Sequence, residues 1–175
     1  SIFLNDRDER VVAEAVRAIH DLPIDSELPR LADHLERYQG QDAAVWRRLI
    51  SAGYQLGDAE RARGIANVIT RRVPPVIARE ALSALLDWTS PPPRDRVTGE
   101  FKSLGDRSAM RNAVAEAIRP QVNRLAGEKA ATARVAALKL AVAYDLALPD
   151  TLYATLFRDR GAEDFEFTKL ALPAV

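Results

Sequence analysis

The chain has 175 residues, of which 47% are apolar and 29% are charged, so it has enough apolar material for a core beneath a well-solvated surface. Lysine plus arginine and aspartate plus glutamate number 25 each, which gives no net attraction to nucleic acid, anionic membrane or an acidic partner. Cysteine is missing, which excludes disulfides, thiolate metal sites and covalently attached haem within this sequence. Because no run of about 18 apolar residues occurs, we expect no direct membrane insertion.

A helical pattern recurs along the chain at a fixed interval. Val16, Leu49 and Leu82 occupy equivalent points of three similar segments, thirty-three residues apart each time, and Leu138 follows in a fourth copy after a longer gap. Such a period is typical of an α-solenoid, in which each helix pair buries its apolar face against neighbouring pairs. The sequence therefore predicts an all-α fold of about four helical hairpins, with residues 1–175 forming one domain.

The first hairpin is the clearest. Apolar residues at i, i+3, i+4 and i+7 predict a helix over 12–19, with Asn5 or Asp6 as its cap. The same spacing predicts a partner helix over 28–35, where Pro29 is tolerated because it lies in the first turn.

The second hairpin is predicted to join helices over 43–57 and 58–71 by a very short turn. Gly57 ends the first helix and Asp58 caps the second.

The third and fourth hairpins are less regular. The third opens at 74–75 and runs to Trp88, and its partner helix contains Pro120, which we expect to kink or split it. The fourth combines a helix over 135–142 with apolar residues at 152–156. Residues 165–172 resemble the start of a fifth hairpin, so we expect the solenoid to be truncated at both ends.

A Pro-rich loop at about 89–107 interrupts the period. One interpretation is a loop that docks a partner through Arg94, Asp95, Arg96 and Phe101, since insertions in repeat proteins map to one face, which often binds. The alternative is a loop that folds over its own repeat, with Phe101 and Leu104 covering apolar surface. The two interpretations differ in an expected stability effect: alanine at 94–96 lowers the melting temperature strongly only if the loop covers its own repeat.

Other candidate sites carry less weight. His20 and His34 lie near helix ends without metal-ligand spacing, and we expect surface or capping roles. Arginines over 47–72, close to Trp46, form the densest basic cluster, but acidic neighbours favour a solvated helix face over a nucleic-acid groove. The tryptophans and Tyr144 are expected to be packing residues. We find no pattern for a catalytic centre, a cofactor or a metal in the sequence.

Two stretches resemble a known family. These are residues 10–24, Arg-Val-Val-Ala-Glu-Ala-Val-Arg-Ala-Ile-His-Asp-Leu-Pro-Ile, and residues 81–99, which include Pro-Pro-Pro-Arg-Asp-Arg-Val-Thr-Gly. Together with the repeat they resemble the HEAT-repeat region of large exported proteins of planctomycetes and their relatives, described as sorbosone-type sugar dehydrogenases. In that family a β-propeller precedes the helical repeats, and a c-type cytochrome module with a CxxCH haem motif follows them.

The resemblance implies an oxidoreductase parent in the periplasm or at its membrane, with haem c outside this segment. No catalytic or haem-binding residue is carried over, because the family holds those residues in other modules. We therefore expect a non-catalytic scaffold whose partners are neighbouring domains of the parent chain or another protein. The alternatives are a free-standing HEAT adaptor and a HEAT-like DNA glycosylase, of which the second requires a strongly positive groove.

Overall fold

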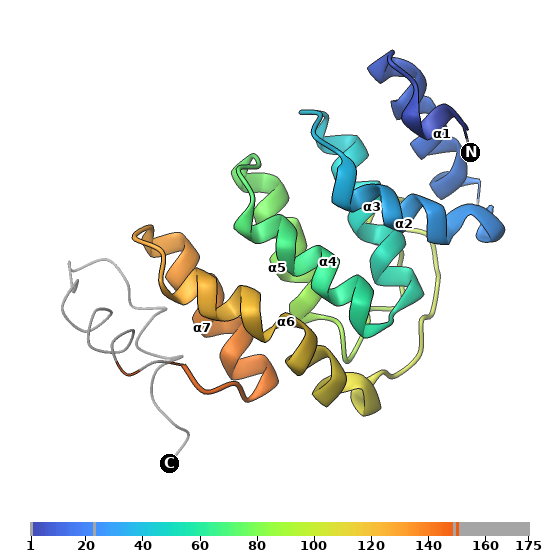
Figure 1. The fold of residues 1–175 in the computed structure, drawn as a ribbon. Coiled ribbons are helices and arrows are strands. Elements are labelled where there is room, and N and C mark those ends of the chain that lie inside the picture. The colour runs from blue at the N-terminus through green and yellow to red at the C-terminus, as the bar shows by residue number, and fades with distance from the viewer. Residues whose placement is uncertain (1, 23, 149, 151–175) are drawn as a thin grey trace.

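The computed structural model describes residues 2–22, 24–148 and 150 (Figure 1). Within that part the chain is all-helical, as predicted, and its α-helices are α1 (Glu9–Asp21), α2 (Leu28–Arg37), α3 (Ala43–Leu56), α4 (Ala59–Thr70), α5 (Pro75–Leu86), α6 (Arg111–Ala126) and α7 (Ala131–Tyr144). Short 3₁₀ turns, η1 (Ile2–Asn5), η2 (Asp25–Glu27) and η3 (Ser108–Met110), precede α1, α2 and α6. The helix expected at 152–156 and the start of a hairpin at 165–172 lie outside the described residues.

Side-chain caps fix where several helices begin. The predicted cap of α1, Asn5 or Asp6, was wrong by three or two positions. The carboxylate of Asp8 accepts the hydrogen bond from the backbone N–H of Arg10, while Asp6 accepts from the N–H of Asp8. In the second hairpin, Gly57 ends α3 with φ 78° and Asp58 accepts from the N–H of Arg61 at the start of α4. The short turn predicted there is confirmed.

Pro120 does not split α6. The helix runs without interruption from Arg111 to Ala126, so of the predicted kink or split, the split was wrong and the kink stays a prediction. Pro120 lies on the exposed side of the helix, whereas Ile118 and Val122 are buried, and α6 packs on α4 and α7. Burial of that apolar face outweighs the one backbone hydrogen bond that proline removes.

The helices contact one another in two rows. In one row α1 contacts α3, α3 contacts α5 and α5 contacts α7; in the other, α2 contacts α4 and α4 contacts α6. The rows are joined because α2 packs on α3, α4 on α5 and α6 on α7. Figure 1 shows the helices following one another in chain order from the N-terminal end to α7.

The repeating positions of the sequence lie in the odd-numbered row. Val16, Leu49 and Leu138 are buried on α1, α3 and α7, and Leu82 packs against the core from α5. Trp46, Trp88 and Tyr144 are also buried, which confirms that they are packing residues. None of the described helices is both long and apolar enough to cross a membrane.

Candidate functional site

The loop over residues 87–107, which joins α5 to η3 and α6, is held at its end by Arg107. The guanidinium of Arg107 donates to the backbone carbonyls of Tyr54 (2.6 Å) and Gln55 (2.9 Å) at the C-terminal end of α3. It also lies over the rings of Tyr54 and Trp88. A cation at this point satisfies carbonyls that have no partner in the helix and faces the negative end of the helix dipole.

The tip of the loop is a small turn. Arg94 and Phe101 form an isolated antiparallel bridge, and the backbone N–H of Asp95 donates to Glu100 (2.8 Å). The carboxylate of Asp95 accepts from the N–H groups of Val97 and Thr98, both at 2.8 Å. Local hydrogen bonds therefore give the tip a defined shape.

Arg96 attaches the loop to α5. Its guanidinium donates to Glu80 (3.0 Å), Asp87 (2.7 Å) and the hydroxyl of Ser83 (2.8 Å), and it lies 5.2 Å from the ring centre of Tyr54. Burial acts to lower the pKa of Arg96, but the hydrogen bonds and charges of Asp87 and Glu80 outweigh it and raise the pKa. The Arg96 side chain is 10% exposed, so its charge is turned inward.

Asp95 attaches the same loop to α3. The side-chain amide of Gln55 donates to its carboxylate (2.8 Å), and the hydroxyl of Ser51 lies 3.4 Å from it. Burial acts to raise the pKa of Asp95, but hydrogen bonds from the backbone of Thr98 and Val97 outweigh it and lower the pKa. The side chain is 5% exposed.

A second carboxylate faces the same cluster from α1. Asp21 lies 2.9 Å from Nδ1 of His20, and Nε2 of His20 lies 2.9 Å from the hydroxyl of Ser51. Arg48 donates two hydrogen bonds to Asp21, of 3.0 and 2.7 Å. This hydrogen bonding by Arg48 is the main cause that lowers the pKa of Asp21. A carboxylate only accepts hydrogen bonds, so Nδ1 of His20 donates to Asp21.

Asp21, His20 and Ser51 thus have the hydrogen-bond order of a serine hydrolase triad. A nucleophile must reach a substrate carbonyl, whereas Ser51 is 1% exposed and its hydroxyl also lies against Asp95. Each polar atom has a partner inside the cluster, which is the usual condition for burying such groups. The arrangement binds the loop to α1 and α3 and offers no access for acyl transfer.

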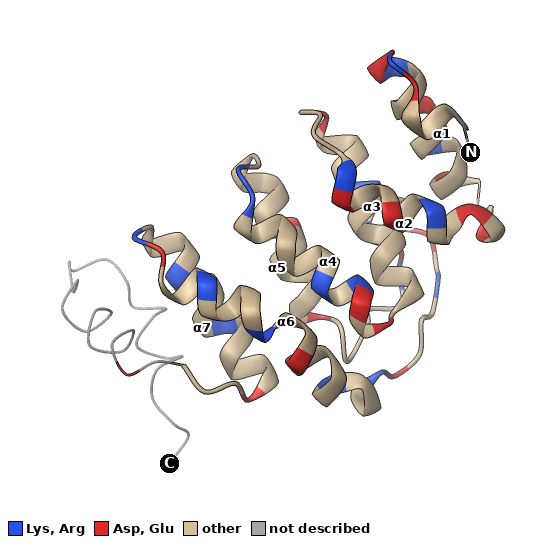
Figure 2. Cartoon of the chain, viewed as in Figure 1, with Lys and Arg blue, Asp and Glu red and all other residues tan. Residues whose placement is uncertain are grey.

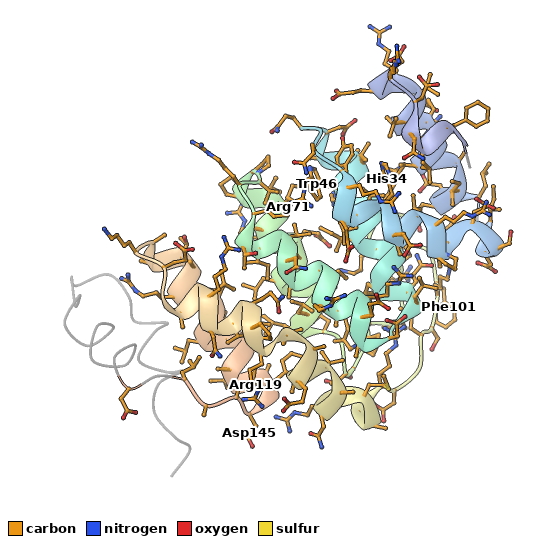
Figure 3. All side chains as sticks on the ribbon, viewed as in Figure 1. His34, Trp46, Arg71, Phe101, Arg119 and Asp145 are labelled. Atoms are coloured by element: carbon orange, nitrogen blue, oxygen red, sulfur yellow. The ribbon has the colours of Figure 1, made fainter. Side chains whose placement is uncertain are left out.

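The four predicted docking residues separate into two groups. Asp95 and Arg96 are bound inside the protein, whereas Arg94 and Phe101 are exposed, Phe101 by 76%. Phe101 therefore does not cover apolar surface, but Leu104 does pack against the core. Figure 3 labels Phe101 on this loop, at the side of the molecule away from α7.

The sequence interpretation of His20 was wrong, because its side chain is 1% exposed and belongs to the buried cluster. His34 is partly buried on α2, and this burial, with the charge of Arg37, lowers its pKa. No three His, Cys, Asp or Glu side chains among the described residues lie together so that they could hold a metal ion.

The basic cluster of the sequence is dispersed in the structure. Arg48 binds Asp21 and Arg61 binds Asp33, while Arg71 donates to backbone carbonyls. Figure 2 shows basic and acidic residues interspersed along the helices.

Sequence reasoning missed Ser51, Gln55 and Arg107. A signal for the first two exists, because they are polar residues one helical turn apart in an otherwise apolar segment, a pattern that indicates a buried hydrogen-bonded pair. Comparison with known proteins adds no assignment, since no family model, curated protein or solved structure matches this chain.

Proposed function

We propose that this chain is a non-catalytic scaffold built from HEAT-like helical hairpins. The observation that carries the proposal is the two-row packing, in which each hairpin contacts the next through both of its helices. Stacks of this kind resist bending better than flexible linkers and keep attached modules at a set distance.

The part of the scaffold that meets a partner is the loop tip with Arg94 and Phe101. A large apolar ring that is 76% exposed on a defined turn is a favourable anchor for a protein partner. Asp95 and Arg96 serve this role indirectly, because they fix the loop on α3 and α5. The ordering of the loop is complete before a partner binds, which lowers the entropic cost of binding.

The parent chain is proposed to be an exported, sorbosone-type sugar dehydrogenase with a c-type cytochrome, in the periplasm or at its membrane. This proposal rests on the resemblance of residues 10–24 and 81–99. A residue from each stretch belongs to the buried cluster. His20 of the first stretch lies 3.8 Å from Asp95 of the second, inside the buried cluster. A scaffold between donor and acceptor modules suits electron transfer, which favours a fixed separation.

Site-specific photo-crosslinking in the producing organism tests the docking surface. A photoreactive phenylalanine analogue at position 101 is expected to give a discrete crosslinked product, and the same analogue at Leu22, which is 69% exposed on the first hairpin, is the matched control. Equal products at both positions, or none at 101, would contradict docking through the loop.

Sequencing the natural reading frame on both sides tests the parent. Propeller repeats upstream and CxxCH downstream are expected for the dehydrogenase. A frame that ends within a repeat or two on either side would remove the dehydrogenase and leave a free-standing adaptor, and the crosslinking result would still stand.

A further inference from the structure

A pocket of about 380 Å³ lies at the edge of the molecule formed by the turn between α2 and α3, the turn between α4 and α5, and the end of α6. The 87–107 loop covers the opposite edge of the hairpins. It binds the C-terminal end of α3, whereas the pocket lies at the turn that precedes α3. The side chains that matter to its chemistry are Gln39, Gln41, Trp46, Arg71, Arg72 and Arg124.

The pocket gathers positive charge in a chain whose net charge is zero. Three arginines line it and no Asp or Glu is among its lining residues. The nearest carboxylate in sequence, Asp42, is occupied as the cap of α3, where it accepts from the N–H of Ala44 at 2.7 Å. The turn between α4 and α5 is basic in Figure 2.

Arg71 is held rigidly in this pocket. It donates to the carbonyls of Leu35 (3.0 Å) and Tyr38 at the end of α2, and its guanidinium lies 4.8 Å from the ring centre of Trp46, beside which Figure 3 labels it. A guanidinium has five N–H donors, and two carbonyls leave some of them for a further acceptor. Its position is thus fixed before any ligand binds.

Arg72 and Arg124 differ from most arginines in the described part of the chain. Their side chains are exposed, and within the described part neither has a hydrogen bond or an ion pair. Elsewhere arginines face carboxylates, as Arg48 faces Asp21 and Arg96 faces Asp87. Two uncommitted guanidinium groups beside a fixed third one suit an oxyanion, which the planar fork of arginine binds through two parallel hydrogen bonds.

We propose that this pocket binds a phosphate group. The Gln39 and Gln41 amides supply neutral donors next to the arginines, and the volume accommodates a phosphate with an organic substituent. The site is separate from the loop, because it shares no residue with it. Its ligand is a soluble phosphate compound or the headgroup of an anionic lipid, and the experiment separates these sources.

Calorimetric titration with sodium pyrophosphate at low ionic strength tests the site, since screening by salt weakens such binding. Wild-type protein is expected to bind, and the variant R72Q/R124Q is expected to bind at least about tenfold more weakly, because it loses two charge-assisted contacts. The control R10Q/R79Q changes the net charge by the same amount at exposed arginines outside the pocket, and we expect it to bind like wild type. The single variant R124Q repeats the test if the double variant is less stable.

Co-sedimentation with vesicles identifies the source of the phosphate. Binding to phosphatidylcholine vesicles that contain phosphatidic acid, lost in R72Q/R124Q and kept in R10Q/R79Q, assigns a lipid headgroup. Binding of pyrophosphate without binding to these vesicles assigns a soluble phosphate. The proposal is overturned if neither probe binds, or if the control variant weakens binding as much as the pocket variant does.

Discussion

Arg96→Ala is expected to destabilise the protein far more than alanine at the exposed Arg94 of the same loop. The substitution removes hydrogen bonds to Glu80, Asp87 and Ser83, and of the two carboxylates it leaves Glu80 with only Arg47, at 4.0 Å. Each charge-assisted hydrogen bond contributes about 1.5–3 kcal/mol, but Asp87 is 42% exposed and recovers part of this from water. We therefore expect a loss of about 3 kcal/mol, which corresponds to roughly 6–12 °C in melting temperature for a chain of this size.

Scanning calorimetry with a matched variant checks this value. Arg94→Ala, two positions earlier, removes an exposed arginine whose guanidinium donates to the carbonyl of Gly99, so its expected cost is below about 0.5 kcal/mol. Arg96→Lys keeps the charge but cannot reach three acceptors in different directions, and we expect an intermediate melting temperature. Melting temperatures of Arg96→Ala and Arg94→Ala within about 2 °C of each other would refute the reasoning, and would return the loop to a purely docking role.

Three further predictions concern the same region. Gly57→Ala, at φ 78°, places a Cβ 2.5 Å from the guanidinium carbon of Arg107, whereas the Cβ of Gly99→Ala, at φ 74°, meets no atom within 4 Å. Urea unfolding should therefore show a loss of about 1 kcal/mol for Gly99→Ala, from backbone strain alone, and a clearly larger loss for Gly57→Ala. Because the pKa of Asp95 is lowered in the folded protein, its contribution to stability is present above the ordinary carboxyl pKa of about 3.9 and is lost as the pH falls below it. Wild type should therefore lose more stability between pH 5 and pH 3 than Asp95→Asn does. Equal losses would contradict this. Ser51→Ala removes a buried hydroxyl from the cluster and should cost about 1–2 kcal/mol in chemical denaturation, with no loss if the hydroxyl is not bonded as described.

The sequence predicted the helices well because their burial follows a helical period. Val16 and Leu49 are buried where the thirty-three-residue interval places them, and Gly57 ends its helix as expected. The split at Pro120 was wrong because a local rule about proline does not include the packing of the opposite face of α6 on α4.

The candidate site was only partly predictable. Composition and the break in the period singled out the loop, but not which of its charges are buried. That depends on hydrogen-bond partners distant in sequence: Ser51 and Asp95 are 44 positions apart, and Gln55 and Lys102 are 47 apart. A single sequence carries no signal for such pairings, so Arg96 and Phe101 appeared equivalent although one is internal and the other exposed.

The contact between the loop and α1 has a consequence for how the protein opens. In a stack where each hairpin touches only its neighbours, an end hairpin can unfold without disturbing the rest. Here His20 of α1 lies 3.8 Å from Asp95, which belongs to the loop after α5, so the first hairpin also touches the third. Detaching α1 therefore exposes a buried carboxylate far along the chain, and amide hydrogens of α1 and of the loop should exchange together as one cooperative unit rather than in order from the end.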